Sequence, residues 1–310
     1  MMKAVRLSAC TVGLLFTYTK VLSQELVPEL VFTHAYLQSG SDAKQAGADG
    51  AIYIFPNVAK DIDAIVTIKG RSSDKVSLTA IDLDGPDQDT QNGTGYDNAW
   101  QPQVAYDGGH APANTSWWME FEVSFADHED HGKEISVNGF FVTGLDVDGD
   151  GKSLHEFLTF YNQKNYTIEQ NTDIQPVSIR GCLSDYNANG KEFDGPTKNY
   201  PKITTTATDV MITNFYANTN DFVVRIGAKT GAYASSKADR MNSLWFKSFA
   251  FNIPVAHLPL SYLAYNEPTN QENAVEKAVV AAGGNSDNEN DYACLENNGS
   301  RKQGRRSKIY

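Results

Sequence analysis

Alternating hydrophobic and polar residues are the strongest structural signal in this chain. The segment 117–125 (WWMEFEVSF) places Trp117 and Met119 on one face and Trp118 and Glu120 on the other. Successive side chains of a β-strand point to opposite faces. The alternation therefore predicts an antiparallel strand with Trp117 in the core and Trp118 on the solvated face.

The same period-two pattern recurs along most of the chain. The runs are bounded by Gly, Asn, Asp and Pro, which favour turns. Parallel βαβ folds need helical crossovers, and no strong amphipathic helix lies between the runs. We therefore predict an all-β chain that folds as a two-sheet antiparallel β-sandwich of jelly-roll type. The predicted strands lie within residues 29–37, 51–58, 62–68, 75–83, 117–125, 134–145, 154–161, 208–217, 222–226 and 244–253.

The two ends of the chain differ from this body. Residues 1–23 combine basic residues, the apolar stretch 7–17 and a small residue at Ser23, which predicts a cleaved signal peptide too short to span a bilayer. Residues 267–310 are polar and poor in hydrophobic residues, which predicts a disordered tail. The folded domain is expected at 25–265, with no membrane insertion, and the protein is expected to be secreted or displayed on the cell surface.

The net charge narrows the choice of partners. The chain has 38 acidic residues against 26 Lys plus Arg, a formal charge of −12. This acidity argues against nucleic acid or an anionic membrane as a partner and favours divalent cations, cationic surfaces or neutral polymers. Beyond the signal peptide, Cys182 and Cys294 either pair in an oxidising compartment or stay free thiols.

The acidic loop 144–156 (GLDVDGDGKSLHE) carries the clearest chemistry. Asp146, Asp148 and Asp150 alternate before a glycine, as in calcium loops where carboxylates converge on a hard cation. The bidentate glutamate of an EF-hand stands at position 12, whereas Glu156 stands at position 11. The flanks alternate like strands, so we expect a strand–loop–strand calcium site and not an EF-hand. The alternative is a Gly/Asp hairpin without metal.

A second acidic stretch occurs at 80–89 (AIDLDGPDQD). Asp82 and Asp84 follow a β-rich run and form a second candidate calcium loop. The two loops bind separate ions or meet at one end of the sandwich. The alternative for this second loop is a solvated turn, because Pro86 interrupts the alternation of acids.

The segment His128-Glu129-Asp130-His131 contains two potential zinc ligands. Its spacing is H-E-x-H, not the H-E-x-x-H that places two histidines on one helical face. It also precedes Gly132 between two predicted strands, where a hairpin turn is needed. We therefore interpret it as a solvated turn.

Trp118 is the principal candidate for ligand binding. Aromatic rings on a solvated strand face stack on the apolar faces of sugars, although packing against a sheet is the more common role of Trp. The sequence contains no G-x-S-x-G, Walker or G-x-G-x-x-G motif. Scattered acids could still form a glycosidase pair.

Four stretches resemble a secreted domain that is common in Bacteroidetes, often near the N-terminus of cell-surface proteins. This resemblance implies an exported β domain without agreed catalytic residues, and the acidic loop at Asp146 matches the family's own acidic turn. The stretches are TGYDNAWQPQV (94–104), GLDVDGDGKSLHEFLTFYN (144–162), TTTATDVMITNFYANTNDFVVRIGA (204–228) and SLWFKSFAF (243–251).

These observations predict a noncatalytic secreted β-sandwich with calcium-stabilised loops and an adhesive or glycan-binding role. Its expected partner is an extracellular glycan or surface component. Two alternatives stay open: a polysaccharide hydrolase or lyase on a jelly-roll scaffold, and a structural protein of the extracellular matrix. A cleft with paired carboxylates favours the enzyme, and an open sheet with an exposed Trp118 favours glycan binding.

Overall fold

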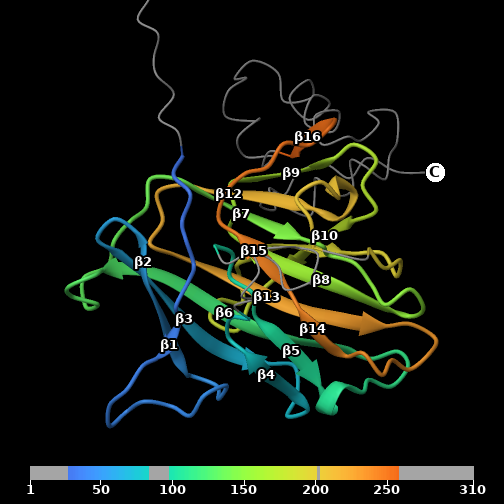
Figure 1. Ribbon diagram of the computed structural model, residues 1–310, viewed down its shortest axis with the longest axis horizontal. Helices are drawn as coiled ribbons and strands as arrows, with labels where there is room; N and C mark the ends of the chain where they lie inside the picture. Colours follow the sequence, from blue (N-terminus) through green and yellow to red (C-terminus); the bar gives the residue numbers. More distant parts are fainter. Residues whose placement is uncertain (1–26, 84–97, 201–202, 258–310) are drawn as a thin grey trace, which may run out of the picture.

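The computed structural model describes residues 27–83, 98–200 and 203–257 (Figure 1). The predicted signal peptide and the polar tail 267–310 lie outside these residues. The described chain is all-β, and every pair of strands in it is antiparallel, so the predicted fold class is confirmed. It contains no helix with the length and apolarity to cross a membrane.

The strands follow the alternating runs of the sequence closely. They are β1 (Tyr36–Leu37), β2 (Ile52–Ala59), β3 (Ile62–Arg71), β4 (Val76–Ala80), β5 (Gln103–Tyr106), β6 (Ser116–Asp127), β7 (Phe140–Leu145), β8 (Leu154–Tyr161), β9 (Asn165–Glu169), β10 (Gln175–Arg180), β11 (Asn189–Asp194), β12 (Ile212–Tyr216), β13 (Asp221–Thr230), β14 (Asp239–Met241), β15 (Ser243–Trp245) and β16 (Pro254–His257). Short 3-10 turns occur at Asp107–Gly109 and Thr208–Val210.

The strands form two layers. One layer is an eight-stranded sheet in the order β1-β2-β3-β6-β13-β8-β11-β10. The second layer consists of a five-stranded sheet, β15-β7-β12-β9-β16, and a three-stranded sheet, β14-β5-β4. Because β14 and β15 follow one another in the chain, the two smaller sheets lie next to each other in front of the long strands (Figure 1).

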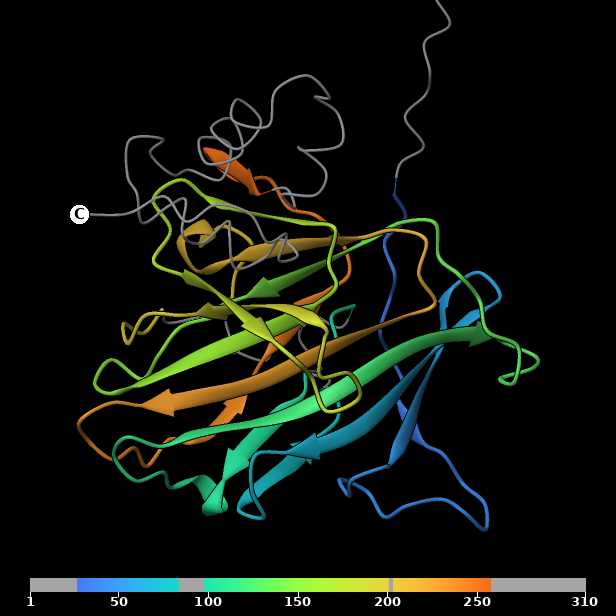
Figure 2. The same ribbon diagram turned by 180° about the vertical axis from the view of Figure 1, so that it is seen from behind.

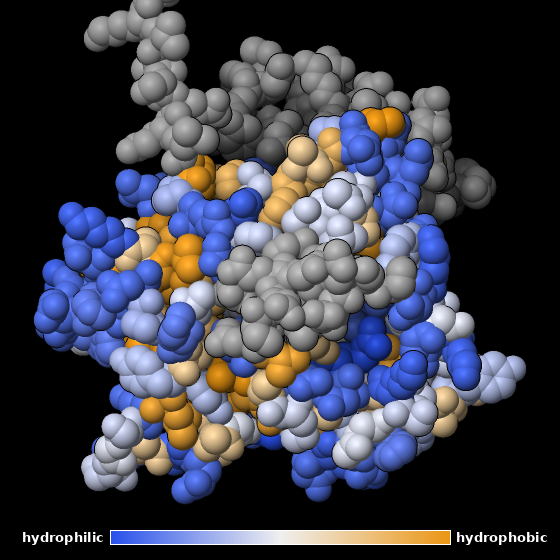
Figure 3. Space-filling view, viewed as in Figure 1, coloured by the Kyte–Doolittle hydropathy of each residue, from blue (hydrophilic) through white to orange (hydrophobic). Residues whose placement is uncertain are grey.

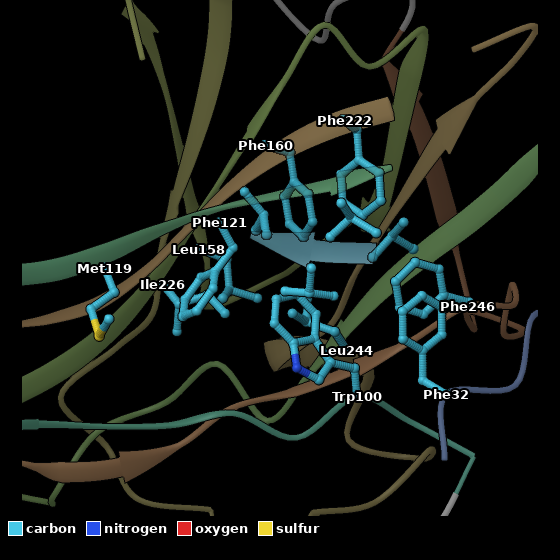
Figure 4. Close-up of a cluster of buried hydrophobic side chains, with 14 of the residues drawn as sticks. Phe32, Trp100, Met119, Phe121, Leu158, Phe160, Phe222, Ile226, Leu244 and Phe246 are labelled. Carbon is cyan, nitrogen blue, oxygen red and sulfur yellow. The ribbon is translucent and has the colours of Figure 1, made fainter. Parts of the chain in front are cut away.

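The core lies between these layers and is rich in aromatic side chains (Figure 4). Phe121 of β6 meets Trp100 edge to face, with the ring centroids 5.3 Å apart. Phe32 stacks on Phe246 at 3.8 Å. Trp117 is also buried, as its place in the alternation predicted. Burial of this apolar area is the main force that holds the two layers together.

The strands that sequence alternation missed are short or polar. β10 (QPVSIR) is the edge strand of the large sheet, and β11 (NGKEFD) lies between β10 and β8; both are mostly polar, although Phe193 of β11 is buried in the core. In the other direction, residues 134–139 were expected to extend a strand but precede β7. On the face shown in Figure 3, hydrophilic residues surround the rim and apolar residues form patches between them.

Candidate functional site

The acidic loop predicted to bind calcium is buried and ion-paired within the protein. It leaves β7 after Leu145 and enters β8 at Leu154. Asp148 is 1% exposed and Glu156 is 2% exposed. Arg240 of β14 donates from Nη2 to Asp148 Oδ1 at 3.1 Å and from Nε to Glu156 Oε1 at 2.5 Å. The guanidinium thus supplies the positive charge that the sequence pattern assigned to calcium.

The other two carboxylates of the loop have opposite environments. Burial, together with the charges of Asp148 and Glu156, raises the pKa of Asp146 to about 9. Burial also opposes ionisation of Asp150, but hydrogen bonds from the backbone N–H groups of residues 152–154 outweigh it and lower the pKa. Asp146 is therefore protonated at neutral pH, whereas Asp150 is ionised and closes the hairpin.

The structure brings Asp148 and Glu156 together on Arg240, and Asp146 lies near enough for their charges to raise its pKa. Among the described residues, no group of three or more His, Cys, Asp or Glu side chains is arranged to hold a metal ion. Asp82 accepts the backbone N–H of Gln101 at 2.8 Å. Asp84 lies outside the described residues. Calcium binding by these loops therefore stays a prediction.

The turn at 128–131 is not merely solvated, which corrects the interpretation from sequence. His128 Nδ1 lies 2.7 Å from one oxygen of Asp63, and His131 Nε2 lies 2.8 Å from the other. Asp63 is 1% exposed and also accepts the backbone N–H of Asn57 at 2.7 Å. Both histidines therefore fasten the β6–β7 turn to the β2–β3 hairpin. Their shared acceptor, Asp63, lies on β3, 65 residues or more away in the chain, and no sequence spacing indicates this.

These contacts change the ionisation of the groups in this clamp. Burial alone would raise the pKa of Asp63, but the hydrogen bonds from Asn57, His128 and His131 outweigh it, and the pKa is lowered. The hydrogen bond to Asp63 raises the pKa of His128. The turn is thus a structural clamp that depends on pH.

The outer face of the eight-stranded sheet carries the candidate sugar-stacking residue. Trp118 lies on this face and is half-buried. The guanidinium of Arg225 lies 3.9 Å from its ring centroid, in the geometry of a cation–π contact. Arg225 also donates to the fully buried Glu120 at 2.6 Å. One side of the indole ring is therefore covered by the protein's own cation.

The segment 181–188 between β10 and β11 lies across this outer face. Figure 2 shows it in yellow, in front of the long strands. The backbone N–H of Leu183 donates to Glu120 at 2.7 Å, which anchors the segment to β6. A Cβ at Gly70 would lie 2.8 Å from Leu183 Cδ1, so glycine at this position lets the segment approach β3 closely.

A pocket opens beside this segment, near the start of β13. It has a volume of about 360 Å³. Its walls come from β6, the β8–β9 turn, the 181–188 segment and the β12–β13 turn, which are far apart in the chain. Its polar side chains include carboxylates, amides and an ammonium group. They are Glu122, Asn162, Lys164, Asp185, Asn218 and Asp221.

Asp221 is a carboxylate of the pocket whose pKa is shifted from its usual value. Burial raises its pKa, and so do the charges of Glu122 and Glu134. The sequence predicted that 117–125 has a polar face, but it did not predict the pocket. The signal available was the polar face of 117–125; nothing in the sequence showed which turns would surround it.

The comparisons with known proteins give distant similarity only. A scan against models of protein families finds no match, and a search of curated proteins finds no relative. Among solved structures, the chain is similar to the crystal structure of the N-terminal domain of the Streptococcus gordonii adhesin Sgo0707, with a TM-score of 0.38 and 9% sequence identity. The match covers 72% of this chain and 64% of that chain. Similarity at this level assigns no family, and the function has to be inferred from the residues themselves.

Proposed function

We propose that this protein is an exported adhesive β-sandwich that binds an extracellular saccharide, without cleaving it, at the outer-face pocket. The observation that supports this proposal is the pocket itself. Its volume of about 360 Å³ lies in the range of small-molecule sites, roughly 300–1,000 Å³. Sugar hydroxyls both donate and accept hydrogen bonds, and the amides of Asn162 and Asn218 can do the same.

Trp118 belongs to the same face but not to the pocket. It stands four residues before Glu122 on β6, which corresponds to about 13 Å along a strand. A single sugar ring in the pocket does not reach it, whereas a saccharide of several residues does. Trp118 is therefore proposed as a secondary stacking residue, with Arg225 holding the indole ring in place.

Binding to a panel of soluble and insoluble polysaccharides tests the proposal. Ser184 is exposed and lines the pocket, so Ser184→Trp should fill it without disturbing the core. Ser77→Trp on β4 is the matched control, because Ser77 is exposed on the other layer. Retention of the wild type and the control, with loss for Ser184→Trp, supports the proposal. Equal retention of all three proteins, or no retention of the wild type by any polymer, overturns it.

A glycoside hydrolase is the second candidate function, and one observation favours it. Glu122 and Asp221 both line the pocket, and the pKa of Asp221 is raised, as the acid of such a pair requires. Release of reducing ends from a bound polymer would establish the enzyme, especially if Asp221→Asn abolished it. Binding without release is the outcome that our proposal predicts.

Calcium enters the proposed function in a restricted form. An ion held by Asp148 and Glu156 has to displace the guanidinium of Arg240, because both carboxylates already contact it. Calcium would then replace the guanidinium of Arg240 as the positive charge beside Asp148 and Glu156. The ligand-binding face of the protein would not depend on this exchange.

A further inference from the structure

The pocket on the outer face is acidic. Three carboxylates, Glu122, Asp185 and Asp221, line it. Lys164 is the cation among the described residues of its wall. Lys69 pairs with Glu122 and its charge also acts on Asp221, so the three carboxylates face two cations and the excess is one negative charge.

Two of these carboxylates already have strong partners. Glu122 accepts from Lys69 Nζ at 2.8 Å, in a half-buried ion pair. Asp185 accepts the backbone N–H of Asn187 at 2.8 Å. Both carboxylates therefore already accept a hydrogen bond from another group of the protein.

Asp221 has a weaker hydrogen-bond partner than these two carboxylates. The contact to its Oδ1 is the hydroxyl of Thr219 at 3.5 Å, which is long for a hydrogen bond. Burial and the charges of Glu122 and Glu134 act against its ionised form and outweigh the Thr219 hydrogen bond and the charge of Lys69, which favour it. A cation that enters the pocket would relieve this repulsion and gain a charge-assisted hydrogen bond.

We propose that the pocket recognises the ammonium group of an amino sugar, with Asp221 as its ion-pair partner. This inference rests on the proposed function and names its substrate class. The space is larger than an isolated ammonium ion needs, and Asn162 and Asn218 supply neutral hydrogen-bonding groups for the hydroxyls of the ring. The ligand is thus a polymer or oligomer that bears free amines, such as a deacetylated hexosamine chain.

Titration calorimetry with two matched oligomers tests the inference on the full chain. The probes are a glucosamine hexamer and an N-acetylglucosamine hexamer, which differ in charge because acetylation removes the ammonium group. Hydrogen bonds to charged groups contribute about 1.5–3 kcal/mol, so the wild type should bind the glucosamine hexamer at least about tenfold more tightly. Asp221→Asn should abolish this preference, whereas Asp74→Asn, at an exposed position between β3 and β4, should retain it.

The possible outcomes separate this inference from the proposed function. Equal binding of both hexamers by the wild type overturns the ammonium site and leaves saccharide binding intact. Binding of neither hexamer, when other polysaccharides bind, also overturns the ammonium site alone. Binding of a lysine hexapeptide as tight as that of the glucosamine hexamer overturns the assignment to a sugar. A preference that persists in Asp221→Asn overturns the role of Asp221.

Discussion

The acidic loop and the outer-face pocket both contain several carboxylates, but these carboxylates differ in burial and in their ion-pair partners. In the loop, Asp148 and Glu156 are almost completely buried and share the guanidinium of Arg240. In the pocket, Asp221 faces an accessible cavity among other acids. The loop resembles the core of a folded domain, where buried charges are paired. The pocket is the site at which we propose that a ligand binds, with Asp221 as the charge that meets it.

A sequence pattern typical of cation binding can therefore be paired with a cation of the protein itself, while a cavity lined by carboxylates can form without any motif. The alternating acids of 144–156 match a calcium loop, yet their counter-charge comes from β14. The carboxylates of the pocket have no motif, yet they line an open cavity. Residue type indicates which groups can bind a cation. The fold determines whether a lysine or arginine of the protein already forms an ion pair with them.

The largest expected effect is from removal of the loop's own cation. Arg240→Gln leaves Asp148 and Glu156 buried without a counter-charge, and breaking a buried pair in this way costs about 3–5 kcal/mol. For a domain of this size we expect the Tm to fall by about 10 °C. Thermal unfolding measures it, with the exposed Arg180→Gln as the control.

The Tm of Arg240→Gln is also expected to depend on calcium. Millimolar calcium should recover part of the lost Tm in Arg240→Gln, because the ion can take the place that the guanidinium leaves. An Arg240→Gln protein that melts like the wild type would show that the loop is not held by this ion pair, and the contrast with the pocket would fail.

A smaller effect of opposite sign is expected at Asp146. Its folded pKa of about 9 lies far above the usual value of 3.8, so ionisation of the unfolded chain removes stability as the pH rises from about 4 through 9. Asp146→Asn mimics the protonated acid. It should raise the stability at pH 7 by at least about 1.4 kcal/mol, the value of a single pKa unit.

The pH dependence distinguishes this account from a calcium ligand. The gain from Asp146→Asn should disappear below pH 4, where the wild-type carboxyl is protonated in both states. A calcium ligand predicts the reverse, namely that Asp146→Asn lowers the Tm in calcium-containing buffer at neutral pH. Melting curves at pH 3.5 and pH 7, with calcium and with EDTA, separate the two cases.

The smallest effect concerns the histidine clamp on Asp63. The pKa of His128 is raised by Asp63, so its stabilising contribution is complete below pH 6.5 and is lost as the pH rises through the folded pKa. The difference in Tm between the wild type and His128→Gln should therefore be greatest near pH 6 and shrink toward pH 9. The exposed His110→Gln is the control, and a difference that grows with pH would contradict the clamp.

The sequence predicted the class of fold from local periodicity alone. The alternation of 117–125 placed Trp117 inside and Trp118 outside, because a strand needs only its own residues to decide its two faces. It did not predict β10, a mostly polar edge strand, or β11, a mostly polar strand that pairs with both β10 and β8. Such strands have no periodic signal, since their pairing is decided by the sheet beside them.

The candidate site was less accessible to sequence reasoning for a related reason. Asp148 and Arg240 are 92 residues apart, and Asp63 and His128 are 65 residues apart. Contacts of this length depend on the register of several strands at once. Sequence spacing therefore singled out the acids of 144–156 but could not show that Arg240 pairs with two of them, and it gave no sign that Asp63 is the partner of two histidines.

Hydrogen–deuterium exchange with and without a glucosamine hexamer shows whether the ligand contacts the pocket or the acidic loop. We predict increased protection in peptides that cover residues 120–124, 182–186 and 216–223, with no change in 144–156. Protection confined to 144–156, or spread over the other layer while the pocket peptides stay unchanged, would contradict the account.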